Sequence, residues 1–174
     1  MSKYVALLRG INVGGGRKVS MSELKELFES LNFKNVSTYI NSGNVIFESS
    51  SEKTEQITNA ITKKFCFSVP VLAFTARQFK KIESAIPKDW QNDKEQKTDV
   101  LFLWPEYDTK TVVSETPFVK DIDEVLYVSG ALIWRINRKF QSKSYMQKGF
   151  IGSDLYKNMT ARNVNTVRKI ASLL

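Results

Sequence analysis

The most informative stretch of this chain reads Leu8-Arg9-Gly10-Ile11-Asn12-Val13-Gly14-Gly15-Gly16-Arg17-Lys18-Val19-Ser20-Met21. An apolar run over residues 4–8 ends at Arg9, and a loop with four glycines and two further cations follows it. Short apolar runs that end at glycine are typical of strands, so we predict a strand over residues 3–9. Ser20, with Glu23 three residues later, predicts the N-terminal cap of a helix. A glycine-rich loop between a strand and a helix N-terminus can close around an anion.

The pattern after this loop predicts the rest of a first α/β unit. A helix begins near Ser20, and strands over 36–40 and 45–48 are joined by Asn41-Ser42-Gly43-Asn44, whose composition suits a hairpin turn with positive φ. A second helix over 52–67 and a strand over 70–76 complete the order β-α-β-β-α-β. This order is the ferredoxin-like split βαβ pattern.

The second half of the chain has a less regular pattern. It predicts a helix over 76–86, a strand over 99–103, a short helix over 109–115, a hairpin of strands 124–129 and 132–137, and one or two helices after Ser142. We therefore predict an α+β fold, with a ferredoxin-like βαββαβ N-terminal unit and a second, related α/β unit as a possible duplication. The expected boundaries are a subdomain over 1–76, a connecting helix and loop over 77–97, and a second subdomain over 98–174 that ends in a helix. The two are expected to pack as one compact unit.

The amino-acid composition excludes several classes of active site. The chain has 174 residues, no histidine and one cysteine. Ser-His-Asp and Cys-His catalysis, histidine-ligated metals and thiolate clusters within one chain are therefore excluded. We expect neither a cofactor nor a metal, and whether the protein is an enzyme stays open. Cys66 is predicted to be buried packing in the second helix. Asp121, Asp123 and Glu124 either hold a divalent cation or form a solvated loop.

The apolar segments of the chain are short. The longest run near the N-terminus has five residues, which is too few for the core of a signal peptide or for a membrane span. We therefore expect a soluble cytoplasmic protein with no membrane partner. The oligomeric state is open, with a monomer preferred.

The net charge of +8 is concentrated at the C-terminal end. The last 37 residues carry eight lysines or arginines against one acid, whereas residues 77–137 carry nine against eleven. A local basic surface attracts phosphate-bearing partners, although it also serves solubility. The cations are interleaved with Phe140, Tyr145 and Phe150. That arrangement suits a surface that grips phosphates and stacks bases, and it equally suits a helix that buries its aromatic residues.

Three motifs occur together in this chain. They are Leu7-Leu8-Arg9-Gly10-Ile11-Asn12-Val13-Gly14-Gly15, Thr38-Tyr39-Ile40-Asn41-Ser42-Gly43-Asn44-Val45-Ile46-Phe47 and Thr160-Ala161-Arg162-Asn163-Val164-Asn165-Thr166-Val167. With these motifs the chain resembles the family known as DUF1697, a bacterial domain of unknown function. The resemblance implies an α+β fold with ferredoxin-like subdomains and no established activity. At Val164 the family pattern leads us to expect an aromatic residue. If that aromatic residue stacks on a ligand, this chain lacks part of the site; if it serves packing, little changes.

The loop, the hairpin turn and the basic end supply the candidate binding residues. The glycines let the backbone approach a ligand, and the cations and the helix N-terminus supply positive charge. The candidates for binding an anion or a nucleic acid are Arg9, Asn12, Gly14, Gly15, Arg17, Lys18, Asn41, Ser42, Asn44, Arg138, Lys143, Arg162, Asn163 and Arg168. The candidate glycines, asparagines and arginines each have a structural alternative to ligand binding. The glycines can simply permit a sharp turn, Asn163 or Asn165 can cap the last helix, and Arg162 can form an internal salt bridge.

Three functions are compatible with these residues. The first is a non-enzymatic binding module for nucleic acid or another polyanion that uses the basic surface. The second is an enzyme or receptor for a phosphorylated or carboxylated small metabolite that uses the glycine loop. The third is a protein-interaction domain. We expect the end of the first strand near residues 49–51 and the Asn41 turn at the opposite edge of the sheet, so that the loop and the turn need not share a site unless the long loop folds back.

Overall fold

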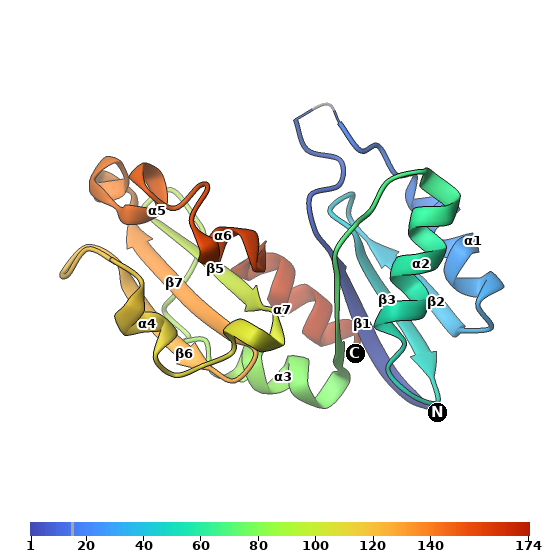
Figure 1. The fold of residues 1–174 in the computed structure, drawn as a ribbon. Helices are drawn as coiled ribbons and strands as arrows, with labels where there is room; N and C mark the ends of the chain where they lie inside the picture. Colours follow the sequence, from blue (N-terminus) through green and yellow to red (C-terminus); the bar gives the residue numbers. More distant parts are fainter. Residues whose placement is uncertain (15) are drawn as a thin grey trace. The chain divides into compact units, whose positions relative to one another are not determined.

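The computed structural model of this protein describes residues 1–14 and 16–174, and the chain divides into two compact units (Figure 1). Residues 1–80 and the last two residues form the first unit, and residues 81–172 form the second. The boundary falls within helix α3 (Ala76–Ser84), inside the predicted connection 77–97. The described residues form two four-stranded antiparallel sheets with helices, so the fold is mixed α+β.

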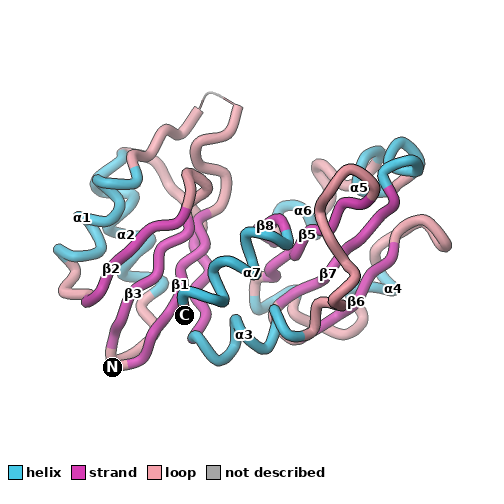
Figure 2. The backbone as a smooth tube through the Cα atoms, turned by 180° about the vertical axis from the view of Figure 1, so that it is seen from behind, coloured by secondary structure: helices cyan, strands magenta, loops and turns pink. Residues whose placement is uncertain are grey.

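The first unit is built on a sheet with the strand order β2-β3-β1-β4. Its elements are β1 (Ser2–Leu8), α1 (Met21–Ser30), β2 (Lys34–Tyr39), β3 (Asn44–Ser49), α2 (Thr54–Phe65) and β4 (Val71–Thr75). Helices α1 and α2 lie together on one face of this sheet (Figure 2). Alternate strand positions and one stripe of each helix fill the core between them. That core includes Tyr4, Ala6, Leu8, Leu24, Phe28, Phe47, Ile57 and Ile61.

The predicted cap of the first helix is present. Ser20 has an extended backbone, and its hydroxyl accepts a hydrogen bond from the backbone N–H of Glu23 at 3.4 Å. Side-chain capping satisfies one of the N–H groups that the first helical turn leaves unpaired. The loop therefore ends, and α1 begins, where the local sequence indicates.

The strand register places the glycine loop beside the hairpin turn, so the expectation of opposite edges is wrong. β1 pairs antiparallel with β3, with Leu7 opposite Asn44 and Ser2 opposite Ser49. Antiparallel pairing puts the C-terminal end of one strand beside the N-terminal end of its neighbour. The end of β1 is therefore next to the turn and not to residues 49–51. The backbone N–H of Leu8 donates to the carbonyl of Gly43 at 2.8 Å.

The sheet of the second unit has the strand order β6-β7-β5-β8. Counted from the first strand of each unit, this is the same spatial order as in the first sheet. The strands are β5 (Gln96–Leu103), β6 (Glu124–Val128), β7 (Ala131–Asn137) and β8 (Met159–Asn163). The helices are η1 (Pro105–Tyr107), α4 (Val112–Glu115), η2 (Arg138–Lys143), α5 (Tyr145–Lys148), α6 (Asp154–Lys157) and α7 (Val164–Leu173).

Strand β8 is an element that the sequence analysis missed. It pairs antiparallel with β5, with Leu101 opposite Ala161 and Val100 opposite Arg162. Because it has only five residues and carries Thr160 and Arg162 at buried positions, it lacks the apolar alternation of a recognisable strand. Arg162 is therefore a buried residue of this strand, just before the last helix.

The prediction that Cys66 is buried is also wrong. Helix α2 ends at Phe65, and Cys66 follows it as the C-cap residue in the left-handed conformation, with φ of 59°. A residue in that position leaves the helical face on which the apolar pattern placed it. The Cys66 thiol is consequently exposed.

The connection between β7 and β8 is broken into short helices. In the first unit the corresponding connection holds the single 12-residue helix α2, whereas η2, α5 and α6 have six, four and four residues. Ser144 and Ser153 each cap a new helix, accepting from the backbone N–H of Met146 and Tyr156. Each internal cap begins a separate short helix. The second sheet thus has an interrupted helical cover.

Candidate functional site

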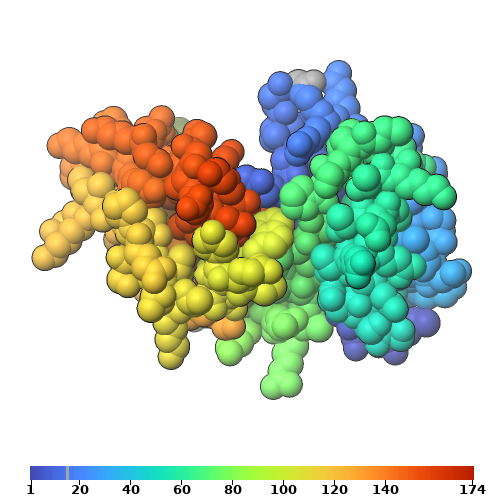
Figure 3. Space-filling view, in the orientation of Figure 1, coloured from blue at the N-terminus to red at the C-terminus, as the bar shows by residue number. Residues whose placement is uncertain are grey.

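The glycine loop, residues 9–20, takes left-handed backbone conformations at several positions. The angle φ is 69° at Gly10 and 62° at Gly14, and it is also positive at Asn12 (55°) and Arg17 (46°). Glycine and asparagine tolerate this region, but for arginine it is strained. The loop projects from the body of the first unit (blue atoms in Figure 3), with Arg17 and Lys18 exposed. The candidate Gly15 lies outside the described residues.

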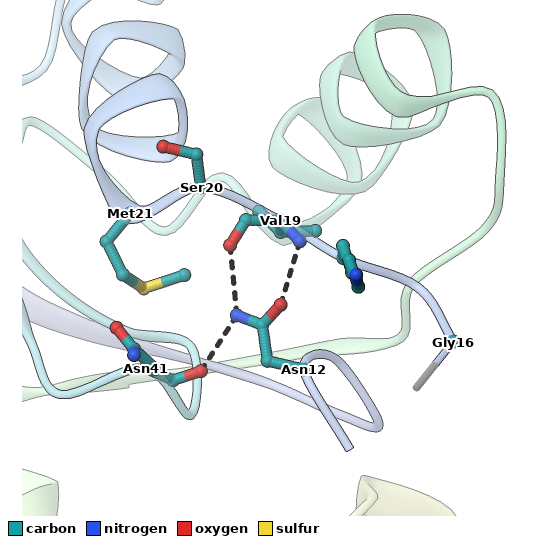
Figure 4. A pocket seen from close by; sticks show the side chains of 7 residues that line it. Asn12, Gly16, Val19, Ser20, Met21 and Asn41 are labelled. Atoms are coloured by element: carbon teal, nitrogen blue, oxygen red, sulfur yellow. Dashed lines mark hydrogen bonds between the residues drawn. The ribbon is translucent and has the colours of Figure 1, made fainter. Parts of the chain in front are cut away.

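The side chain of Asn12 holds the loop closed. Its Nδ2 donates to the carbonyls of Val19 and Asn41, both at 2.9 Å, and its Oδ1 accepts from the backbone N–H of Val19 at 2.9 Å (Figure 4). The backbone N–H of Asn12 donates to the carbonyl of Arg17 at 3.2 Å. We call this set of contacts the Asn12 clamp. Asn12 and Asn41 are therefore brought together, and the Asn12 amide organises the site.

The hairpin turn approaches the loop closely at Gly43. A Cβ built on this glycine would lie 2.7 Å from Cβ of Leu8 and 2.8 Å from Cδ1 of Ile11, and its φ is 73°. Both the contact and the backbone conformation require glycine here. The neighbouring candidates serve the turn, since Nδ2 of the buried Asn44 donates to the carbonyl of Tyr39 and to Oγ of Ser42, each at 2.9 Å.

An open cavity of about 600 Å³ lies between the loop and the start of α1. It is lined by Asn12, Gly16, Lys18, Val19, Ser20, Met21 and Asn41. The N-terminus of α1 borders this cavity, and a helix N-terminus carries a partial positive charge. Lys18 adds a full positive charge. The half-buried Arg9 stands at the root of the loop, where its backbone N–H donates to the carbonyl of Pro70 at 2.9 Å. The arrangement favours a negatively charged ligand.

Two arginines of the basic C-terminal end brace the second unit itself. Arg138 donates through Nε to the carbonyl of Asp93 at 2.7 Å and through Nη2 to Oδ1 of Asn92 at 2.9 Å. Arg168 donates to Oε1 of Gln91 at 2.9 Å and to the carbonyls of Pro87 and Trp90 at 3.2 and 3.0 Å. Both guanidinium groups therefore hold the segment 87–93. The sequence contained no signal for this, because the acceptors are carbonyls and amides distant along the chain.

Arg162 is the most buried cation among the candidates, with 7% of its surface exposed. It donates to Oγ1 of Thr160 at 3.0 Å and to the carbonyl of Ala161 at 2.8 Å. Burial disfavours the charged form and lowers the pKa of Arg162 to about 10. The neighbouring Asn163 accepts from the backbone N–H of Asn165 at 2.8 Å, as expected of a capping residue. Val164 is fully buried, which favours packing as the role of this position.

The aromatic residues of the basic end divide between two environments. Phe150 is buried and Tyr145 half-buried, and their rings pack edge to face in the core of the second unit. Phe140 instead lies near the ammonium groups of Lys139 and Lys143, at 4.8 and 5.9 Å from the ring centroid. Both lysines are exposed. Among the candidate binding residues of the second unit, Lys143 is exposed, whereas the others are half-buried or buried.

Two carboxylates that sequence analysis did not assign to this role organise the second unit. Asp108 accepts from the hydroxyl of Tyr127 at 2.9 Å, the hydroxyl of Ser129 at 3.2 Å and the backbone N–H of Gly130 at 2.7 Å. Burial, together with the hydrogen bond to Asp108, raises the pKa of Tyr127 above 10.0.

Asp123 has the same kind of role. It accepts from Nε1 of Trp134, Oγ of Ser144 and the backbone N–H groups of Val119 and Tyr145. Asp121 and Glu124 are exposed before and at the start of the hairpin, as the solvated-loop alternative predicts, whereas Asp123 is half-buried and hydrogen-bonded. Among residues 1–14 and 16–174, no three His, Cys, Asp or Glu side chains are grouped to hold a metal ion.

No helix formed by these residues has the length and apolar character that crossing a bilayer requires.

Comparison with other proteins places the chain in a family. It is similar to the solved structure of the conserved bacterial protein SP0830 from Streptococcus pneumoniae, with a TM-score of 0.82 and 26% sequence identity, over 99% of this chain and 98% of the other. No curated protein matches it. The family described as protein of unknown function DUF1697 matches residues 1–134, which contain the first two motifs and end before the third. The chain therefore belongs to the DUF1697 family.

Proposed function

We propose that this protein binds a small phosphorylated or carboxylated ligand in the cavity beside the glycine loop. The observation that carries the proposal is the cavity itself, about 600 Å³, bordered by Lys18, the N-terminus of α1 and the Asn12 clamp. Backbone N–H groups at a helix start and a nearby cation favour negative charge. Because the clamp already ties Asn12 to Val19 and Asn41, ligand binding needs little further ordering at these three residues.

The hydrogen bonding and burial of the arginines in the second unit favour the loop site over the basic C-terminal end. Arg138 and Arg168 already donate to acceptors of the protein, and Arg162 is buried. Arg17 and Lys18 are exposed on the loop. A ligand can therefore reach Arg17 and Lys18 without breaking a hydrogen bond between the described residues.

The test uses the protein labelled with ¹³C at its methionine methyl groups and titrated with pyrophosphate and glycerol 3-phosphate. The chain has four methionines, and Met21 lines the cavity. We expect a saturable shift of the Met21 signal. Lys18→Met should weaken binding about tenfold, because a charge-assisted hydrogen bond is lost. Lys25→Met, an exposed lysine on α1 outside the cavity lining, is the matched control. No shift of Met21 at millimolar ligand, or an equal loss in the control, would contradict the proposal.

Nucleic-acid binding is a second candidate, and the arrangement around Phe140 favours it. An aromatic ring near two exposed lysines combines a stacking platform with phosphate contacts. Fluorescence anisotropy with a labelled single-stranded oligonucleotide tests this candidate. The double variant Lys139→Glu, Lys143→Glu should abolish binding, and wild-type affinity should fall steeply with salt. Binding that the double variant retains would refute the role of this surface.

We also infer that both units are ferredoxin-like and are related by duplication. The support is that each sheet repeats one strand order, counted from its own first strand. In each unit, the backbone N–H of the last residue of the first strand donates to the carbonyl of a glycine in the hairpin turn. Leu8 donates to Gly43 at 2.8 Å, and Leu103 donates to Gly130 at 3.0 Å. The cytoplasmic location, the monomeric state and the protein-interaction alternative stay predictions.

A further inference from the structure

A second cavity lies within the second unit, between its sheet and the segment that holds η2, α5 and α6. Its volume is about 300 Å³, and small-molecule sites have volumes of about 300–1,000 Å³. Asp99, Leu101 and Trp134 line it from the strands, together with Ala161. Their shared wall follows from the register, because Asp99 lies opposite Trp134 and Leu101 lies opposite Ala161.

The interrupted helical cover explains why this cavity exists. In the first unit, α2 places Ile57 and Ile61 in the core without a break. In the second unit, α5 ends at Lys148 and α6 begins at Asp154, and the chain between them contributes Ile151 to the cavity. Ile151 nevertheless has 78% of its surface exposed. Covering such a side chain is favourable for a ligand that reaches out of the cavity.

The walls of the cavity suit a flat aromatic molecule. Trp134 belongs to the floor of the cavity, with 2% of its surface exposed, and its Nε1–H donates to Oδ1 of Asp123 at 2.9 Å. Met146 and Met159 also line the cavity. Thioether sulfur atoms and indole rings both make favourable contacts with aromatic rings. An aromatic ligand would therefore find a thioether contact from Met146 of α5 and a second one from Met159 of strand β8 in the sheet.

One edge of the cavity carries an ion pair. Nζ of Lys97 lies 3.3 Å from Oδ2 of Asp99 and 5.6 Å from the centroid of the Trp134 ring. An ammonium group has three donors, and Asp99 accepts one. The lysine side chain is 35% exposed, so a carboxylate on the ligand can take a further donor from the same ammonium. Asp99 meanwhile holds the lysine at the edge of the apolar wall.

We propose that this cavity binds a small aromatic carboxylate, with its ring against Met146, Ile151 and Ala161 and its carboxylate on Lys97. The site is contained in the second unit and is independent of the glycine loop. Its ligand differs from the one proposed there because apolar surface, rather than a helix N-terminus, forms most of the contacts.

The test uses the same methionine-labelled protein with 2-naphthoate as the probe and 2-naphthol as the neutral analogue. We expect 2-naphthoate to shift the signals of Met146 and Met159 and to leave those of Met1 and Met21 unchanged. Lys97→Met should weaken 2-naphthoate binding about tenfold and leave 2-naphthol binding unchanged. Lys110→Met, an exposed lysine of the same unit outside the cavity lining, should change neither. Ala161→Trp should fill the cavity and abolish both.

The outcomes separate this proposal from the one for the glycine loop. A shift of Met21 alone, or no shift of Met146 and Met159 at millimolar 2-naphthoate, overturns the aromatic site and leaves the loop site standing. Equal affinity of 2-naphthoate and 2-naphthol, or no effect of Lys97→Met, overturns the role of the carboxylate. If pyrophosphate and glycerol 3-phosphate do not shift the Met21 signal, the loop proposal is overturned and this one is unaffected.

Discussion

In both units the segment after the first strand is tied to the turn between the second and third strands, but the polar group that ties it differs. In the first unit, the amide of Asn12 donates to the carbonyl of Asn41. In the second unit, the carboxylate of Asp108 accepts from Ser129 and from the backbone N–H of Gly130. The two ties occupy corresponding places on the same strand order.

The difference in charge decides what each connection can bind. An amide is neutral and both donates and accepts, so it can hold the glycine loop without opposing an anion. A carboxylate accepts only and carries negative charge, so it repels an anion at the corresponding place in the second unit. An equivalent backbone connection is therefore compatible with the proposed anion site in the first unit and forms a structural tie in the second.

The largest expected effect tests how closely the loop and turn of the first unit must approach. Gly43→Ala should lower the free energy of unfolding by about 3 kcal/mol, through left-handed strain and a clash with Leu8 and Ile11. Gly14→Ala should lower it by only about 1 kcal/mol, since its φ is 62° but nothing lies within 4 Å of its Cβ position. Urea unfolding of both variants measures the difference. Equal losses would show that the close approach is unimportant.

The second prediction exchanges the amide of the first unit for the group that the second unit uses. Asn12→Asp removes both donors of the Asn12 clamp and sets a carboxylate against two carbonyls. We expect a loss of about 2 kcal/mol at neutral pH and no anion binding at the loop. The loss should shrink at acid pH, where a protonated carboxyl can donate again. Asn165→Asp, which removes one exposed hydrogen bond of 3.3 Å, is the control for urea unfolding.

The third prediction makes the reverse exchange. Asp108→Asn should lower the free energy of unfolding by about 1 kcal/mol and lower the pKa of Tyr127, which burial still holds above its ordinary 10.0. In the wild type the raised pKa means that the folded state keeps the tyrosine proton longer than the unfolded state. The contribution of Tyr127 is therefore lost as the pH rises above 10.0. Titration of tyrosinate absorbance, with Asp154→Asn as control, measures the shift, and an unchanged curve would refute the coupling.

The last prediction, of an equally small effect, concerns the first strand of the second unit. The buried hydroxyl of Thr98 has no hydrogen-bond partner among the described residues. Thr98→Val should raise the free energy of unfolding by about 1 kcal/mol, because an unpaired buried hydroxyl is removed. Thr116→Val should have the opposite sign, since the hydroxyl of Thr116 donates to the carbonyl of Val112 at 2.7 Å. A loss of stability in both variants would contradict this interpretation.

Much of the first unit was predictable because its signals are local. The apolar run of β1, the Ser20 cap and the turn composition each act within a few residues. The second unit was less predictable because its stabilising groups act at long range. Asp123 contacts Trp134 and Ser144, and Arg168 contacts the segment 87–91. The spacing of apolar residues along the sequence does not predict such contacts.

The amino-acid sequence alone determined the family, the order of elements in the first half and the absence of histidine chemistry, because these depend on residue identity and short spacing. Only the tertiary structure decided that the glycine loop meets the hairpin turn, that Arg138 and Arg168 brace the protein, and that a cavity opens under α5 and α6. Those outcomes depend on strand pairing and on which donors meet which carbonyls. Such contacts are settled by the packing of segments far apart in the chain.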